Sequence, residues 1–201
     1  MVTKPDLIEL MRAIGSGECG VAERLLDATP TLVSARLERT EECFIEACCA
    51  QVYAGDTALH AAAFAYDTAF ARLLIESGAG VRASNRRGAE PLHAETIGGP
   101  GNGNWNPTRQ RAVIGYLVEV GADPNAPAVG WVTPLHRAVR NRCSGAVEAL
   151  LSLGSDPYLT NDSGSIAFEL ARWTTGRSGS GSPEARAEQE LIVGLLDRAA
   201  G

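Results

Sequence analysis

The chain has 201 residues, of which 45% are hydrophobic and only 5% aromatic, and its formal net charge is −6. That length suits one domain or one short array of repeats. Its apolar residues are mostly Ala, Leu and Val, which favours closely packed helices over a β-sandwich. The negative charge and the lack of a long basic run argue against nucleic-acid binding, because that affinity depends on clustered Lys and Arg.

The cysteines and the N-terminal segment predict a cytoplasmic protein. Cys19, Cys43, Cys48, Cys49 and Cys143 are odd in number and fit no disulfide framework, so we expect reduced thiols. The cluster of three near residue 48 lacks a C-x-x-C spacing and a nearby His, which favours small buried side chains over metal ligands. No apolar stretch is long enough for a signal peptide or a membrane span.

The N-terminal quarter of the chain predicts three short helices. In residues 5–35, two apolar faces are separated by a Gly-containing turn: Leu7, Ile8, Leu10 and Met11, then Val21, Leu25 and Leu26. In the segment 36–54, apolar residues recur at helical spacing: Cys43, Phe44, Ala47, Cys48 and Val52. We expect an extra helix there.

A motif then recurs along the rest of the chain. Its copies are Gly55-Asp-Thr-Ala-Leu-His60, Gly88-Ala-Glu-Pro-Leu-His93, Trp131-Val-Thr-Pro-Leu-His136 and the degraded Gly164-Ser-Ile-Ala-Phe-Glu169. The first and second copies are 33 residues apart, as are the third and fourth, whereas the second and third are 43 apart. An apolar helix end followed by Gly closes each of the first three units. Such self-similarity predicts stacked units, each with too small an apolar face to fold alone.

Local chemistry explains the motif. Thr57 and Thr133 can cap a helix through the side-chain oxygen, and Pro91 and Pro134 suit the first helical turn, where no N–H is needed. Leucines one residue before the histidines are expected in the core: Leu59, Leu92 and Leu135. Each unit is therefore predicted to begin with a capped helix.

The pattern resembles the ankyrin-repeat family, with its T-P-L-H signature, over about residues 5–200. The resemblance implies a mainly α fold, an α-solenoid of helix-turn-helix repeats with short β-hairpin-like fingers, as a single domain over 1–201. Its parts are an N-terminal cap repeat at 5–35, an inserted segment at 36–54, repeats at 55–87, 88–130 and 131–163, and a C-terminal cap repeat at 164–201. Gly-rich insertions at 98–107 and 174–183 fall between the paired helices, and the Ala, Gly and Arg usage is typical of a bacterial form.

The resemblance also implies roles for single residues. His60, His93 and His136 take the signature position, where the imidazole bridges backbone groups of adjacent fingers. Glu169 replaces that histidine in the fourth copy, and we expect it to pair with His136 and raise the pKa of that imidazole.

Partners of the family bind at the finger tips and the inner face of each first helix. Carried over position by position, this names the binding residues Tyr53, Phe64, Arg86, Arg87, Arg140 and Trp173. Three further candidates are Trp131 at a finger tip, Trp105 in the Gly-rich insertion, which could fold over the groove, and Arg142 between the Gly-rich loops. Trp131 stands where the family prefers Gly, and an exposed Trp there suits a binding hot spot. The leading interpretation is a cytosolic module that recognises a protein partner through its concave face, without a cofactor or metal.

An alternative is a small-molecule site or an unusual enzyme. Glu95 occupies a position filled by Ala62, Ala138 and Ala171 in the other copies, where a carboxylate is poorly solvated unless it is paired. With Arg140 and Arg142 beneath the Gly-rich loops it could hold a small anionic ligand, and His93 or His136 could join it in catalysis. No nucleophile–base pair or cofactor fingerprint accompanies these residues, so catalysis is the less favoured interpretation.

Overall fold

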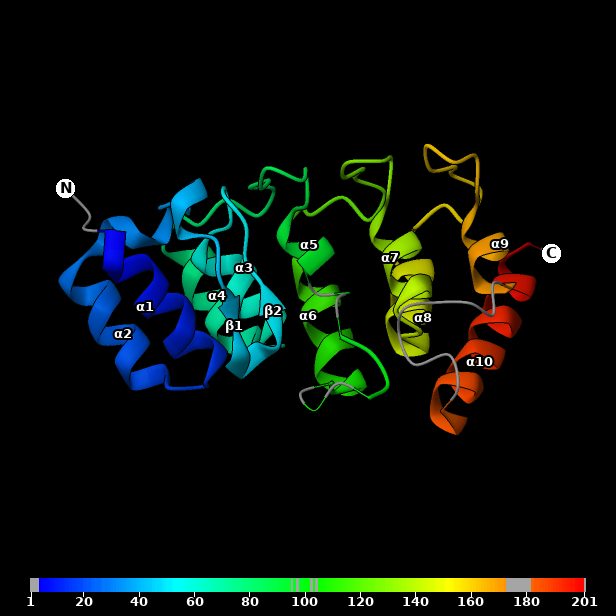
Figure 1. Ribbon diagram of the computed structural model, residues 1–201, viewed down its shortest axis with the longest axis horizontal. Helices are drawn as coiled ribbons and strands as arrows, with labels where there is room; N and C mark the ends of the chain where they lie inside the picture. Colours follow the sequence, from blue (N-terminus) through cyan, green and yellow to red (C-terminus); the bar gives the residue numbers. More distant parts are fainter. Residues whose placement is uncertain are drawn as a thin grey trace.

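The computed structural model describes residues 4–94, 96, 98–101, 103, 105–172 and 182–200. Helices stand in pairs, one pair after another, so that the two chain ends lie at opposite ends of a row (Figure 1). The α-helices are α1 (Lys4–Gly15), α2 (Cys19–Ala28), α3 (Ala58–Phe64), α4 (Thr68–Glu76), α5 (Pro91–Ala94), α6 (Pro107–Glu119), α7 (Pro134–Arg140), α8 (Ser144–Ser152), α9 (Ala167–Arg172) and α10 (Pro183–Ala200). The row of pairs is the stack of units that the repeated motif predicts.

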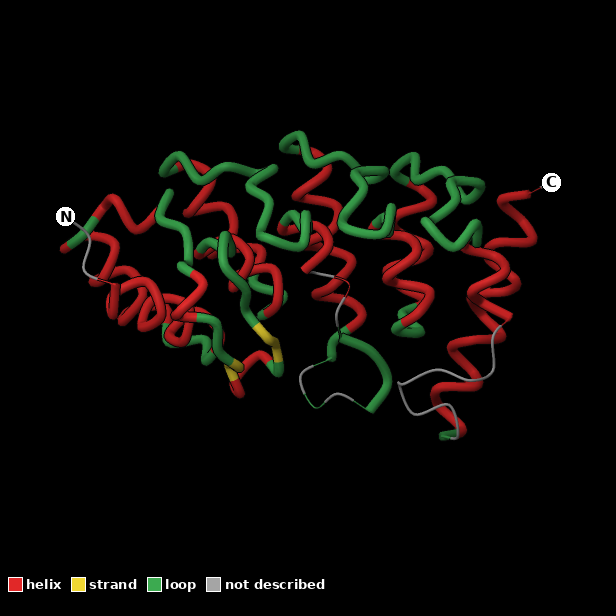
Figure 2. Tube along the Cα trace, turned by 45° about the horizontal axis from the view of Figure 1, so that its top comes forward, coloured by secondary structure: helices red, strands yellow, loops and turns green. Residues whose placement is uncertain are grey.

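The helices form two layers. The first helices of successive pairs contact one another in the order α1, α3, α5, α7 and α9, and the second helices do so in the order α4, α6, α8 and α10. The segments that lead from one pair to the next gather along one long edge, and the turns within pairs lie along the other (Figure 2). We call the first the finger edge and the second the turn edge.

Capping residues fix where the helices start. Asp67 and Asn106 accept hydrogen bonds from the backbone N–H groups three residues later, and Thr133 accepts one from His136 N–H at 3.3 Å. Pro91 and Pro134 begin α5 and α7, as predicted, because a proline in the first turn leaves no N–H unsatisfied. The hydroxyls of Thr57 and Thr133 also lie 3.1 Å and 2.8 Å from Nδ1 of His60 and His136, with which they form capping boxes.

A single apolar core runs through the whole stack. Leu59, Leu92 and Leu135 are buried in it, as predicted. Second helices contribute leucines at equivalent positions, Leu74, Leu117 and Leu150, which are fully buried. Because this core is continuous from one helix pair to the next, each repeat unit is stabilised mainly by packing against its neighbours.

The predicted extra helix in 36–54 is wrong. This segment holds 3-10 turns and a two-stranded antiparallel hairpin: η1 (Pro30–Val33) precedes it, followed by η2 (Arg39–Glu41), β1 (Phe44–Ile45), η3 (Glu46–Cys48) and β2 (Ala50–Gln51). Phe44 pairs with Gln51 and Ile45 with Ala50. Phe44 is exposed while Ile45 is buried, the alternation of a strand. Cys49 has a φ of 50°, which interrupts any helix.

None of the described helices is long and apolar enough to cross a membrane.

Candidate binding surface along the finger edge

Four fingers make up this edge, at residues 53–57, 84–90, 126–133 and 159–166. One backbone hydrogen bond joins each finger to the next: Arg86 N–H to the Ala54 carbonyl at 2.7 Å, Val129 N–H to Arg87 at 2.9 Å, and Asp162 N–H to Gly130 at 2.9 Å. The second step spans ten more residues of sequence than the others, yet it makes the same bond. The fingers therefore keep one register along the whole row.

A histidine in each of the first three fingers forms a hydrogen bond to the next finger, as the resemblance implied. The Nδ1 atoms accept hydrogen bonds from the N–H groups of Thr57, Glu90 and Thr133, respectively, in the same finger. The Nε2 atoms of His60, His93 and His136 each lie 3.2 Å from a carbonyl of the next finger, those of Ala89, Val132 and Ser165. Because Nδ1 is an acceptor, the proton must be on Nε2, which donates to the carbonyl.

Burial keeps these imidazoles neutral. Loss of solvation lowers the pKa of His60 and His136, and it lowers the pKa of His93 to about 3. The expected pairing of Glu169 with His136, and a raised pKa there, are wrong. Glu169 instead accepts a hydrogen bond from Ile166 N–H at 3.1 Å, the task that Nδ1 performs in the other copies. Both ring nitrogens of each neutral imidazole are thus engaged in hydrogen bonds, one within its own finger and one that links this finger to the next.

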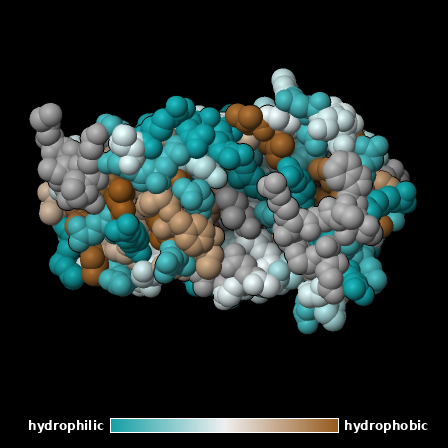
Figure 3. All heavy atoms as spheres, in the orientation of Figure 1, coloured by the Kyte–Doolittle hydropathy of each residue, from teal (hydrophilic) through white to brown (hydrophobic). Residues whose placement is uncertain are grey.

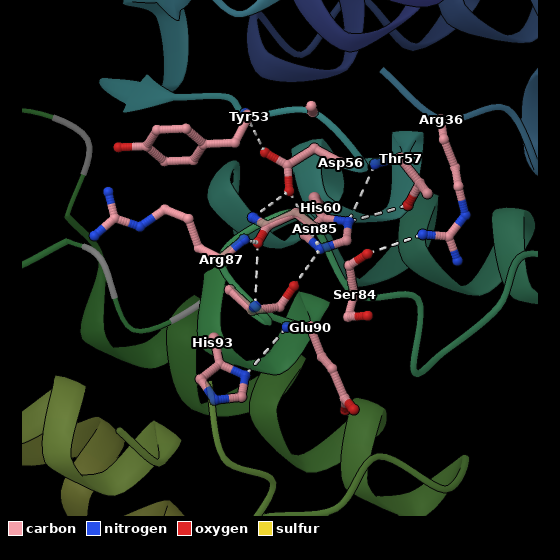
Figure 4. Close-up of polar contacts among 12 residues, drawn as sticks. Arg36, Tyr53, Asp56, Thr57, His60, Ser84, Asn85, Arg87, Glu90 and His93 are labelled. Carbon is pink, nitrogen blue, oxygen red and sulfur yellow. Dashed lines mark hydrogen bonds and ion pairs between the residues drawn. The ribbon is translucent and has the colours of Figure 1, made fainter. Parts of the chain in front are cut away.

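Asp56 links the first two fingers through a buried carboxylate. Its carboxylate is fully buried and accepts hydrogen bonds from Tyr53 N–H at 2.7 Å and Asn85 Nδ2 at 2.8 Å. It also lies 3.3 Å from His60 Nε2. Figure 4 shows this buried network, with the side chains of Tyr53 and Arg87 extending to one side of it. The network fixes the backbone from which those two side chains project.

An arginine–tyrosine cluster, comprising Tyr53, Arg86, Arg87, Arg137 and Arg140, gathers beside the fingers. Two guanidinium groups lie over the tyrosine ring, at 5.0 Å for Arg86 and 5.1 Å for Arg87 from its centroid. Such cation–π contacts stabilise and orient both partners. The side chain of Arg137, from α7, is half-buried, and its Nη1 donates to the carbonyl of His93 at 3.1 Å. Residues of two fingers and one first helix thus form a common surface.

One member of the cluster is paired within the chain. Arg86 makes a two-pronged ion pair with Glu42, in which Nη2 lies 2.8 Å from Oε2. Glu42 also accepts a hydrogen bond from Ala54 N–H at 3.0 Å. The bond from Arg86, followed by that from Ala54, lowers the pKa of Glu42 to about 2. The inserted segment 36–54 is thereby fastened to the finger edge.

The third finger carries the most exposed apolar side chains of this edge. Val129 is 69% exposed and Trp131 is 64% exposed. The space-filling view shows largely hydrophilic atoms along the finger edge, with an apolar spot near its middle (Figure 3). Trp131 has a φ of 52°, a left-handed conformation that costs a residue other than Gly about 1 kcal/mol.

Comparison with protein families agrees with the repeat geometry. A family model described as ankyrin repeats (many copies) matches residues 117–171, and one described as ankyrin repeat matches residues 54–86. The chain is an ankyrin-repeat solenoid. Ankyrin repeats mediate protein–protein interactions, so this solenoid is a protein-interaction module.

Relatives of this ankyrin-repeat chain are much longer proteins. Ankyrin repeat and SOCS box protein 16 of Mus musculus is 33% identical over 141 residues, which are 70% of this chain and 30% of that protein. The human protein of the same name is 32% identical, over 59% of this chain and 24% of the relative. The probable E3 ubiquitin-protein ligase XBOS34 of Oryza sativa subsp. japonica is 34% identical, over 50% and 18%. The chain thus spans less than a third of these relatives.

Two predicted binding residues of the ankyrin solenoid are buried. Phe64, expected on the groove, is 6% exposed and belongs to the core, because an apolar side chain at the end of α3 gains more from burial than from solvent. Arg142 is 5% exposed at the turn edge, with a φ of 58°. Its Nη1 has no hydrogen-bond partner within the described part of the chain. Neither residue supplies exposed surface.

Trp105 does not fold over the fingers. It is half-buried in the turn before α6, and its indole N–H donates to Gln110 Oε1 at 3.1 Å. That turn belongs to the opposite edge of the solenoid (Figure 1). Glu95 and Trp173, and with them the greater part of the second Gly-rich insertion at 174–183, lie outside the described residues.

Sequence reasoning missed Arg137 and Glu42. Arg137 follows the signature histidine directly, where the first two repeats have Ala61 and Ala94. Comparison of the repeats in register would have singled it out. Glu42 gave no signal, because it lies in the inserted segment and its partner Arg86, in the second finger, is 44 residues away.

Proposed function

We propose that this solenoid binds a protein partner through its concave face, formed by the finger tips and the exposed sides of the first helices. Arg87 and Arg140 are exposed there, and Val129 and Trp131 supply apolar area on the finger that follows that of Arg87. A mixture of aromatic, apolar and guanidinium groups is typical of interface centres. The five cysteines are free thiols, which supports a cytoplasmic setting.

The conformation of Trp131 is the observation that carries the proposal. A tryptophan in a left-handed turn destabilises the fold slightly, and its exposed ring gains little from the chain's own core. Gly would adopt the same φ without strain. Residues that hold a strained backbone conformation while exposed are candidates for a role outside folding. A large ring at a finger tip suits insertion into a partner.

The names of the relatives suggest the setting in which such recognition operates. One relative is named for ankyrin repeats and a SOCS box, and another is named a probable E3 ubiquitin-protein ligase. We propose partner recognition alone for the present chain, since it covers only 30% and 18% of those two proteins.

The substitution Trp131→Gly separates binding from folding. We expect the variant to be at least as stable as the parent, with an unfolding free energy higher by about 1 kcal/mol, because the strain at φ 52° is removed. Proteins captured from the lysate of the native cells should be lost with Trp131→Gly, as measured by quantitative mass spectrometry. Leu191→Ala is the matched control, since Leu191 is 56% exposed on α10, in the other helix layer.

An unchanged set of captured proteins with Trp131→Gly would contradict the proposal. Loss of the same proteins with Leu191→Ala would also contradict it, because capture would then depend on the opposite side of the solenoid.

A further inference from the structure

The arginine–tyrosine cluster concentrates positive charge on a chain whose formal net charge is −6. Arg86 is paired with Glu42. The other three arginines have no ion pair with any side chain in the described part of the protein. The cluster is therefore a local exception to the charge of the whole molecule, and three of its four guanidinium groups have no ion-pair partner among the described residues.

Arg137 shows the crowding of positive charge most clearly, although the nearby Tyr53 and Asp56 oppose it to a smaller extent. Burial, followed by the charges of Arg87 and Arg140, lowers the pKa of its guanidinium to about 10. Among the described residues its side chain makes one hydrogen bond, to the His93 carbonyl, which uses one of five N–H donors. A half-buried guanidinium with open donors and two cationic neighbours is in an unfavourable environment until an anion joins it.

The residues around Arg137 are held in place by contacts within the chain. Arg87 lies over the Tyr53 ring, and Tyr53 is held from below by Asp56, which accepts its N–H at 2.7 Å. The Arg87 carbonyl accepts the hydrogen bond from Val129 N–H that joins the second finger to the third. The backbone is thus fixed at both Tyr53 and Arg87 in the free protein. This reduces the conformational entropy lost when a partner binds.

We propose that the partner presents an acidic, extended segment whose carboxylates pair with Arg87, Arg137 and Arg140. This inference rests on the proposed function and adds the chemistry of the partner. A guanidinium fork matches a carboxylate with two parallel hydrogen bonds. Val129 and Trp131 lie on the adjoining finger and receive an apolar side chain of the same segment. A Glu- or Asp-rich stretch with one large apolar residue fits both features.

The charge pattern favours a protein segment over a nucleic acid. Phosphate backbones are bound by long basic surfaces that release many counterions. Here only three guanidinium groups without an ion-pair partner in the described part of the chain lie near one another. The chain as a whole is acidic, so a polyanion would be repelled elsewhere along the solenoid.

The test selects peptides on the whole chain without assuming a partner. A displayed library of random peptides of about 12 residues is selected on the wild-type protein, and the enriched pool is sequenced. We expect an excess of Asp and Glu around an apolar residue. The tightest peptide, made synthetically, should bind roughly ten-fold more weakly to Arg87→Glu and to Arg140→Glu, and should weaken between about 50 and 300 mM salt.

Both substituted arginines are exposed, so the variants are expected to fold. Circular dichroism and thermal unfolding verify this. The matched control is Arg24→Glu, which makes the same charge change on the exposed surface of α2. Its affinity for the peptide should equal that of the wild type.

The remaining outcomes separate this inference from the proposed function. Enrichment of neutral peptides that bind Arg87→Glu normally but lose affinity for Trp131→Gly would refute the acidic segment and leave the proposed face intact. Peptides indifferent to every one of these variants would refute both. Tighter binding of a random single-stranded DNA 20-mer than of the acidic peptide would show that the cluster serves a nucleic acid, and the inference would be wrong.

Discussion

The finger edge and the turn edge of the solenoid differ in how strictly the repeat is kept. At the finger edge every step from 53–57 onwards has the same backbone bond and the same histidine bridge. At the turn edge the connections vary in length and conformation. Tyr66 and Arg142 stand at equivalent turns with left-handed φ values of 53° and 58°, whereas the turn between them carries the insertion at 98–107.

The difference shows where an ankyrin chain can change without losing its register. The ten extra residues lie wholly at the turn edge, between α5 and α6. These two helices therefore keep their positions between finger bonds that repeat on either side. The bonds at the finger edge use backbone atoms and buried histidines. Tip side chains such as Arg87 and Trp131 take no part in these bonds. Substitutions there can therefore change the surface that a partner contacts and leave the core unchanged.

The largest effect should come from weakening the finger edge with acid. The folded-state pKa values of the three histidines are lowered, so the unfolded chain binds their protons first as the pH falls below about 6.5. Their stabilisation is complete above that pH and is lost progressively below it; for His93, whose folded-state pKa is about 3, the loss is about 2 kcal/mol at pH 5. Urea unfolding between pH 8 and pH 5, compared at equal ionic strength, measures this loss. Constant stability across that range would contradict the neutral, bridging imidazoles.

A matched pair of glycines compares the two edges directly. Gly55 has a φ of 92° in the first finger, and a Cβ there would lie 2.7 Å from Asn85 Cα. Gly17 has a φ of 70° at the turn edge, with open space around the same position. We expect Gly55→Ala to destabilise the fold by about 3 kcal/mol, through backbone strain and the clash, and Gly17→Ala by about 1 kcal/mol, through strain alone.

Thermal and urea unfolding of the two variants provide the measurement. Equal losses would mean that the fingers can separate without penalty. The finger register would then be less important for stability than the hydrogen bonds indicate.

The fold was largely predictable because the same local signals occur in several copies of the repeat. Thr133, Pro134 and Leu135 specify a cap, a first turn and a core contact in consecutive residues, and the 33-residue period places the insertions. The segment 36–54 occurs once and has no copy to align with. Its apolar residues suited a helix, but the left-handed Cys49 and the alternating burial of Phe44 and Ile45 produce a hairpin.

The candidate surface was predictable only where position in the repeat decides exposure. Tyr53, Arg87 and Trp131 lie at finger tips, which every repeat exposes. Phe64 and Arg140 occupy equivalent helix ends, yet the phenylalanine is buried and the arginine is exposed. At this position the polarity of the side chain determines its exposure. The pairing of Glu42 with Arg86 depends on the path of the unrepeated segment, which no local pattern encodes.

Glu90 tests a weaker point of the finger edge. It occupies the helix-start position that is Thr57 and Thr133 in the neighbouring repeats, and it is 9% exposed. Its Oε1 lies 3.4 Å from Arg82 Nε, but Oε2 is buried without a hydrogen-bond partner among the described residues. Burial is the main cause that raises the pKa of this carboxyl. The charged form is therefore unfavourable in the folded state.

Replacement by the residue of the neighbouring repeats should stabilise the chain. We expect Glu90→Thr to raise the unfolding free energy by about 1 kcal/mol at pH 7, because a poorly satisfied carboxylate is removed and a capping hydroxyl is gained. A raised folded-state pKa gives stability that is present below the unfolded value near 4.5 and lost as the pH rises. The advantage of the variant should consequently shrink towards pH 4.5. Glu90→Gln, which keeps the length and removes the charge, should show part of the same gain. Destabilisation by both changes would mean that the ion pair with Arg82 outweighs the burial of the carboxylate.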